Sequence, residues 1–84
     1  MTIEDKIKLI LVNELFVEMP VDAIGLEDGL RDQVGLDSLG FSELRAQCEV
    51  SFGVSISDEH FIPKHFTSVQ TLSALIAELQ NAGR

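Results

Sequence analysis

Apolar side chains recur near the start of the chain at spacings of three and four residues, as they do along one face of an α-helix. The positions are Ile3, Ile7, Ile10, Leu11 and Leu15. Ahead of them, Thr2 and Asp5 have the spacing of a capping box, with Asp in the place of Glu. Pro20 lacks the backbone N–H that a continuing helix would need. The pattern therefore predicts an amphipathic helix over residues 2–18.

The next stretch, residues 19–35, has no helical periodicity and contains three glycines. Aliphatic side chains are nonetheless spaced along it: Val21, Ile24, Leu26, Leu30 and Val34. Loops longer than about 12 to 15 residues are uncommon in compact domains unless they are functional or packed by their own side chains. We expect a long loop here, partly ordered by its aliphatic residues.

A second apolar stripe follows this loop: Leu39, Phe41, Leu44, Cys48 and Phe52. Asp37 and Ser38, which precede the stripe, are residue types favoured at helix N-caps. Gly53 follows it, where glycine commonly ends a helix. These signals predict a helix over residues 38–52.

Two more helical segments complete the chain. Ser57 and Pro63 bound a short helix over residues 58–62. Thr67 and Gln70 have capping-box spacing ahead of a last apolar stripe, which predicts a helix over residues 68–81. We therefore expect one all-α domain over residues 1–84, a four-helix bundle with three long helices, one short helix and a long first loop.

Charge and cysteine content narrow the classes of partner. Fourteen acidic and six basic residues give a net charge of -8, which disfavours nucleic-acid binding. The single Cys48 cannot form an internal disulfide, as expected in a reducing cytoplasm. No stretch approaches the roughly 20 apolar residues of a membrane span, and no signal peptide is evident. We expect a cytoplasmic monomer without nucleic-acid or membrane partners.

The residues that could support catalysis or metal binding form no convincing site. A reactive Ser38 would need an elbow motif and an oxyanion hole, so the ordinary interpretation of that residue is a helix cap. His60 and His65 are five residues apart with Pro63 between them, and Cys48 lies in an apolar stripe. The acidic residues around Asp28 lack the ligand pattern of a calcium loop. A chain of this length also rarely builds a water-excluding catalytic pocket.

One motif changes the interpretation of Ser38. Residues 35–39, Gly-Leu-Asp-Ser-Leu, are followed by Glu43 and Leu44, and together they resemble the attachment motif of acyl carrier proteins. The Phe-Gly-Val-Ser-Ile run at 52–56 and the Thr-Ser-Val run at 67–69 occur in that family's order. The resemblance covers nearly the whole chain.

The resemblance implies a carrier and not an enzyme. In such a carrier a phosphopantetheinyl transferase esterifies the Ser38 hydroxyl with 4′-phosphopantetheine from coenzyme A, and the terminal thiol holds acyl groups as thioesters. Asp37 would help the transferase's magnesium site or the approach of coenzyme A, and Leu39 would contact the transferase. Glu43 and Glu49 would belong to an acidic face that basic partners recognise, to which Arg45 adds a positive charge.

Departures from the family pattern bear on the pathway. Gly40 stands where carriers of fatty-acid synthesis usually have an acidic residue, and Val50 interrupts their acidic pair. The chain looks more like discrete carriers of polyketide or related specialised metabolism, served by an acyltransferase or acyl ligase and by a ketosynthase. Primary fatty-acid synthesis and aminoacyl or peptidyl transfer are the alternatives, although Leu36 argues against a peptidyl carrier.

Apolar residues of the second half define a candidate acyl-chain pocket between the second and third predicted helices. They are Phe41, Leu44, Val54, Ile56, Phe61 and Ile62, and plain core packing is the alternative role. Outside the carrier class, two functions remain open. One is a small acidic helical interaction module without a prosthetic group, and the other is a small hydrolase that uses Ser38 and a histidine.

Overall fold

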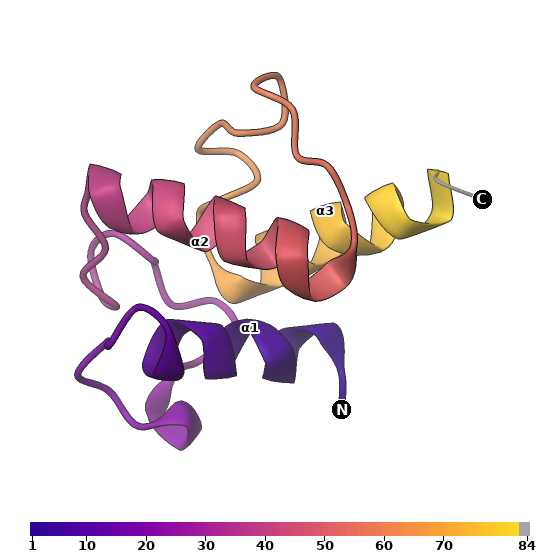
Figure 1. The fold of residues 1–84 in the computed structure, drawn as a ribbon. Helices are drawn as coiled ribbons and strands as arrows, with labels where there is room; N and C mark the ends of the chain where they lie inside the picture. The colour runs from indigo at the N-terminus through magenta and orange to yellow at the C-terminus, as the bar shows by residue number, and fades with distance from the viewer. Residues whose placement is uncertain (83–84) are drawn as a thin grey trace.

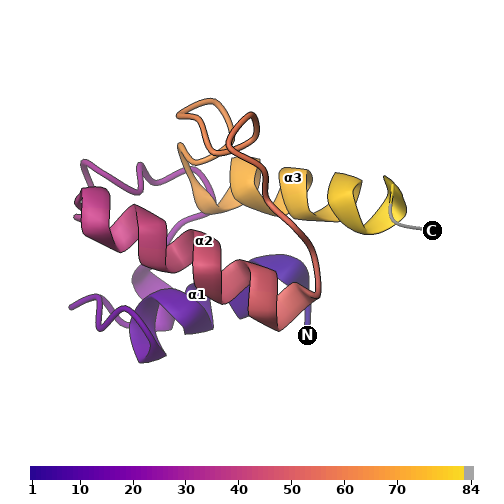
Figure 2. The same cartoon turned by 45° about the horizontal axis from the view of Figure 1, so that its top comes forward.

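A computed structural model describes residues 1–82 as three α-helices joined by two long connections (Figure 1). The helices are α1 (Ile3–Asn13), α2 (Ser38–Phe52) and α3 (Val69–Ala82), and a 3₁₀ turn, η1 (Val21–Ala23), lies in the first connection. Helix α1 packs against both α2 and α3, and the tilted view shows the arrangement of the three helices (Figure 2). The predicted all-α class is confirmed, and residues 83–84 of the predicted domain lie outside the described residues.

Helix α1 begins as predicted but ends early. The Thr2 hydroxyl accepts a hydrogen bond from the Asp5 amide at 3.1 Å, and the Asp5 carboxylate accepts one from the Thr2 amide. The helix ends at Asn13, five residues before the predicted end, and Phe16 has a left-handed φ of 57°. A non-glycine residue in that conformation turns the chain out of the helical path, so the helix ends before Pro20 is reached.

Helix α2 has the predicted bounds, and α3 differs from its predicted bounds by one residue at each end. Gly53 ends α2 with a left-handed φ of 64°. At the start of α3, Ser68 and Thr71 exchange hydrogen bonds between their backbone amides and side-chain hydroxyls. The predicted capping pair of Thr67 and Gln70 is therefore wrong by one residue. The Thr67 hydroxyl instead donates to the carbonyl of Pro63.

No α-helix forms at residues 58–62, where a short one was predicted. This segment makes hydrogen-bonded turns instead, in which the Phe61 amide donates to the Ser57 carbonyl at 3.0 Å. Five residues give too few hydrogen bonds to offset helix nucleation, and Pro63 removes the next donor. In Figure 1 the connection between α2 and α3 rises as open coil above the helices.

A single hydrophobic core lies between the helices and the first loop. It contains Ile7, Ile10, Leu11, Leu44, Cys48, Val69, Leu72, Leu75 and Ile76 from the helices, and Ile24, Leu30, Val34 and Leu36 from the loop. Backbone hydrogen bonds tie that loop to the start of α3: the Leu30 amide donates to the Thr67 carbonyl, and the Gln70 amide to the Leu26 carbonyl, each at 2.9 Å. The expected partial order of the long loop is thus confirmed.

The connection between α2 and α3 is fixed at Ile56, whose side chain is only 1% exposed. The Ile56 amide donates to the Glu49 carboxylate at 2.8 Å, and its carbonyl accepts from Arg45 Nε at 2.9 Å. Arg45 also pairs with Asp58 at 3.0 Å and lies 4.8 Å from the centre of the Phe61 ring. We call Arg45, Glu49 and the Ile56 peptide groups the Ile56 clamp. It provides hydrogen-bond partners for peptide groups that burial would otherwise leave unpaired.

We expect Arg45→Ala to lower the free energy of unfolding by about 1 to 3 kcal/mol, because the Ile56 carbonyl loses its charged donor. The pair with Asp58 adds little to this loss, since the Asp58 side chain is 97% exposed. Urea denaturation followed by circular dichroism measures the change. Glu43→Ala is the matched control on an exposed position of α2 and should change stability by less than about 0.5 kcal/mol. Equal losses in the two variants would contradict a structural role for the clamp.

Candidate functional site

Ser38 is the first residue of α2, and its side chain is exposed. The capping role belongs to Asp37, whose carboxylate accepts a hydrogen bond from the Gly40 amide at 2.8 Å. Two residues before Asp37, Gly35 turns the chain with a φ of 93°, and Leu36 between them is buried in the core. The Ser38 hydroxyl makes no hydrogen bond within residues 1–82. It is therefore held at a fixed place on the surface and left available for chemistry.

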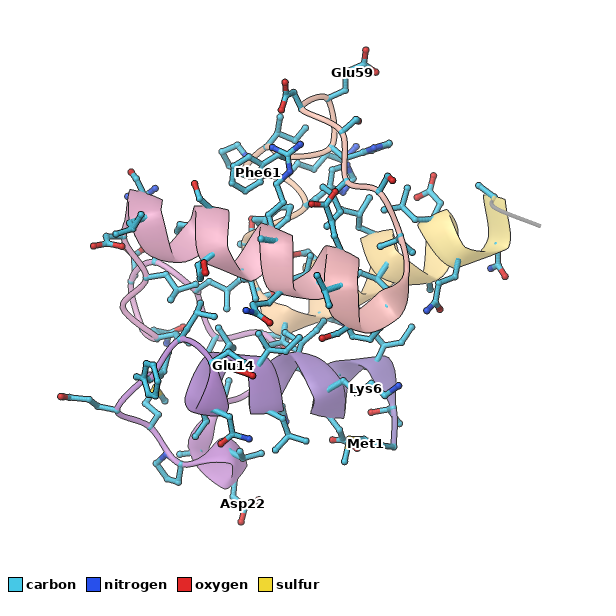
Figure 3. All side chains as sticks on the ribbon, in the orientation of Figure 1. Met1, Lys6, Glu14, Asp22, Glu59 and Phe61 are labelled. Atoms are coloured by element: carbon cyan, nitrogen blue, oxygen red, sulfur yellow. The ribbon has the colours of Figure 1, made fainter. Side chains whose placement is uncertain are left out.

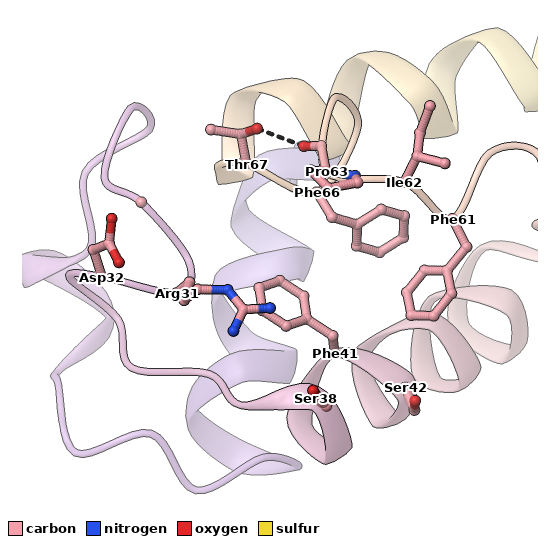
Figure 4. Close-up of a pocket in the computed structure, with 11 residues that line it drawn as sticks. Arg31, Asp32, Ser38, Phe41, Ser42, Phe61, Ile62, Pro63, Phe66 and Thr67 are labelled. Atoms are coloured by element: carbon pink, nitrogen blue, oxygen red, sulfur yellow. Dashed lines mark hydrogen bonds between the residues drawn. The ribbon is translucent and has the colours of Figure 1, made fainter.

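A pocket of about 420 Å³ opens beside Ser38 (Figure 4). Its apolar lining comes from Phe41 on α2 and from Phe61, Ile62, Pro63 and Phe66 on the connection to α3. The Phe61 and Phe66 rings meet edge to face, with their centres 5.0 Å apart. Arg31 and Asp32 of the first loop are the charged residues in the lining. The pocket thus joins the Ser38 hydroxyl to a cluster of three aromatic rings.

The sequence identified only part of this lining. Phe41, Phe61 and Ile62, expected in the pocket, do line it. Leu44 and Ile56 do not: both are at most 1% exposed and belong to the core, because the inner face of α2 carries Leu44 and the clamp holds Ile56 inward. Val54, also expected there, packs against the core instead. Arg31 and Phe66 were missed because each reaches the pocket through the folding of a loop, for which periodicity gives no signal.

A second hollow, of about 580 Å³, lies on the other side of the α2 N-terminus. Two of the apolar side chains that line it, Phe16 and Leu39, are each 79% exposed. Four acidic residues also line it: Glu14, Glu18, Asp37 and Glu43. Leu39 and Glu43 were expected on the partner-binding face. Phe16 was not, because the predicted helix over residues 2–18 placed it within regular structure.

Arg45 and Glu49, also expected on the partner-binding face, are engaged elsewhere. Both side chains are half-buried and bind the Ile56 peptide groups. Residues 45 and 49 are one helical turn apart, so they point toward the same segment of the following connection. The exposed carboxylates near Ser38 are those of Asp37 and Glu43, together with that of Asp32 in the first loop.

Cys48 is fully buried in the core. Burial, together with the nearby Glu49 charge, raises the pKa of its thiol from 9.0 to about 12. The reactive form of a thiol is the thiolate, so we expect Cys48 not to react with thiol reagents in the folded protein near neutral pH.

The two histidines show no arrangement suited to metal binding. Their rings lie edge to face with centres 5.9 Å apart, and His60 Nδ1 is 2.9 Å from the Ser57 hydroxyl. Among residues 1–82, no three His, Cys, Asp or Glu side chains gather as a metal site would require. The same part of the chain contains no helix of the length and apolarity needed to cross a bilayer.

Comparison with known proteins agrees with this geometry. The family model described as "Phosphopantetheine attachment site" matches residues 7–79. An acyl carrier protein of Phytoplasma australiense is 43% identical over 54 residues, which cover 64% of this chain and 68% of that protein. The chain belongs to the acyl carrier protein family, whose members carry 4′-phosphopantetheine and are not themselves catalysts.

Proposed function

We propose that Ser38 is the residue of this carrier to which 4′-phosphopantetheine is attached. The observation that carries the proposal is the exposed, unbonded Ser38 hydroxyl at the start of α2, with the capping role filled by Asp37. The positive end of the α2 dipole favours a phosphate at this position, and the adjacent pocket is open to a pantetheine chain. When bound, the group supplies a thiol that holds acyl groups as thioesters.

Incubation with coenzyme A, magnesium and a broad-specificity phosphopantetheinyl transferase should add the mass of one phosphopantetheine to the protein. Ser38→Ala should gain nothing, whereas Ser51→Ala, at an exposed serine near the other end of α2, should be modified normally. Intact-mass spectrometry measures the gain. Thiol labelling of the folded protein gives a second readout, because Cys48 is buried and its thiol pKa is about 12.

Modification of the Ser38→Ala variant would contradict this attachment site. Failure of two different transferases to modify the folded wild-type protein would instead favour the acidic interaction module without a prosthetic group.

We propose further that the pocket beside Ser38 receives the start of a carried acyl chain. Its apolar rings lie next to the attachment point, and burial of each methylene there contributes about 0.8 kcal/mol. Backbone amide shifts of Phe61 and Ile62 should therefore differ between the acetyl-loaded and octanoyl-loaded proteins. Val50, 83% exposed on α2 and absent from the lining, is the internal control. Unchanged shifts at Phe61 and Ile62 would show that the chain stays in solvent.

The hollow with Phe16 and Leu39 supports a docking surface for the transferase and for synthase enzymes. Its apolar side chains are surrounded by carboxylates, which favours a partner surface with an apolar recess and a basic rim. Charges of this kind mainly raise the rate of encounter, whereas the buried apolar contact sustains the complex. We place this surface beside Ser38 because any enzyme acting on the attached group must approach there.

Leu39→Ala should lower the kcat/KM of phosphopantetheinylation about tenfold, which corresponds to losing most of the contact of one leucine side chain. Val50→Ala, which removes an equally exposed aliphatic side chain near the other end of α2, should leave kcat/KM unchanged. A radiometric or fluorescent transfer assay at two ionic strengths measures both. If the two variants behaved alike, Leu39 would have no part in docking.

The pathway we propose is polyketide-type or related specialised metabolism, in the cytoplasm, with an acyltransferase or acyl ligase and a ketosynthase as partners. Gly40 supports it, because carriers of fatty-acid synthesis usually have an acidic residue at this position. A Cβ here would lie 3.2 Å from a Leu36 side-chain atom and 3.3 Å from the Asp37 carboxylate, so any larger residue would require a small shift of those side chains. Primary fatty-acid synthesis and aminoacyl or peptidyl transfer are the alternatives, which loading assays with acyltransferases and ligases of each pathway separate.

A further inference from the structure

Arg31 is the one cation in the lining of the pocket beside Ser38. Its guanidinium lies 5.3 Å from the centre of the Phe41 ring, and Figure 4 shows it extending from the first loop toward α2, where Ser38 begins the helix. Within residues 1–82 it forms no ion pair and no side-chain hydrogen bond.

We propose that Arg31 binds the phosphodiester that joins Ser38 to the pantetheine chain and so directs that chain into the aromatic pocket. The proposal rests on attachment at Ser38. A phosphodiester is an anion at every physiological pH, and the planar guanidinium can donate two parallel hydrogen bonds to its oxygens. The contact with Phe41 restrains the Arg31 side chain beside the pocket and leaves its N–H groups available.

Electrostatic repulsion around the attachment site also favours this role for Arg31. The added phosphodiester brings one more negative charge to a protein of net charge -8, and Asp32 also lines the pocket. Arg45, the arginine on α2, already donates to the Ile56 carbonyl and pairs with Asp58. The Asp37 carboxylate, which accepts a hydrogen bond from the Gly40 amide, is a further negative charge next to Ser38. Arg31 is therefore the side chain placed to offset this repulsion.

The test compares apo and phosphopantetheinylated forms of the wild type, Arg31→Ala, Arg31→Lys and Lys6→Ala, with loading checked by intact mass. Lys6→Ala is the matched control, because Lys6 is also an exposed cation beside an aromatic ring, 5.8 Å from the centre of Phe52. It lies toward the N-terminal end of α1, across the molecule from the start of α2 (Figure 3). Each alanine variant thus loses one positive charge and one cation–π contact.

In Arg31→Ala the change in Tm from apo to loaded protein should be about 2 to 4 °C less favourable than in the wild type at low salt. The ³¹P resonance of the loaded protein should also move in this variant. Lys6→Ala should match the wild type in both readouts, Arg31→Lys should be intermediate, and added salt should reduce the difference. Subtraction of the apo form removes any effect of the substitutions on the fold itself.

Identical behaviour of loaded Arg31→Ala and loaded Lys6→Ala in both readouts would overturn the role of Arg31. The mass measurement that precedes these readouts tests the attachment site separately. A wild-type protein that gains no mass, or gains it elsewhere than at Ser38, would overturn attachment at Ser38 and not the role of Arg31.

Discussion

The pocket beside Ser38 depends on the hydrogen bonding of the two peptide groups that flank one buried residue, Ile56. The connection between α2 and α3 has no regular secondary structure, and its own backbone hydrogen bonds form turns over residues 57–66, after Ile56. The Ile56 clamp defines it: Glu49 and Arg45 bind the two sides of Ile56, and the isoleucine side chain enters the core. The residues that follow, Phe61 and Phe66, form the far wall of the pocket. Hydrogen bonds between two charged side chains and Ile56 thus determine where the wall of the pocket lies, several residues further along the chain.

Ser38 is positioned in a comparable way from the other side. The first loop is anchored by buried Leu30 and Leu36, and its backbone is bonded to the start of α3. The chain therefore arrives at Asp37 in a fixed direction, and the cap bond to Gly40 starts α2 at the next residue. Core, loop and cap together present one hydroxyl, while the pocket and the acidic hollow lie on either side of it.

The features that could be predicted from the sequence are those encoded locally. The apolar stripes located all three helices, and Gly53 marked the end of α2, because these signals lie within a few residues of their effect. The early end of α1 at Asn13, followed by a left-handed Phe16, has no comparable signal, since nothing in the residue type of Phe16 favours that conformation. Arg45 looked like a surface charge because its partner, the Ile56 carbonyl, lies eleven residues away. Arg31 reaches the pocket only through the folded loop.

The burial of Cys48 has a consequence for the fidelity of a carrier. A thioester is open to attack by any other thiolate, and an exposed cysteine on the same chain would compete at high effective concentration. The cargo would then migrate to a thiol that no partner enzyme can reach, or the two sulfurs would oxidise to a disulfide. By keeping Cys48 neutral and inside the core, the fold leaves the thiol of the prosthetic group without an internal rival.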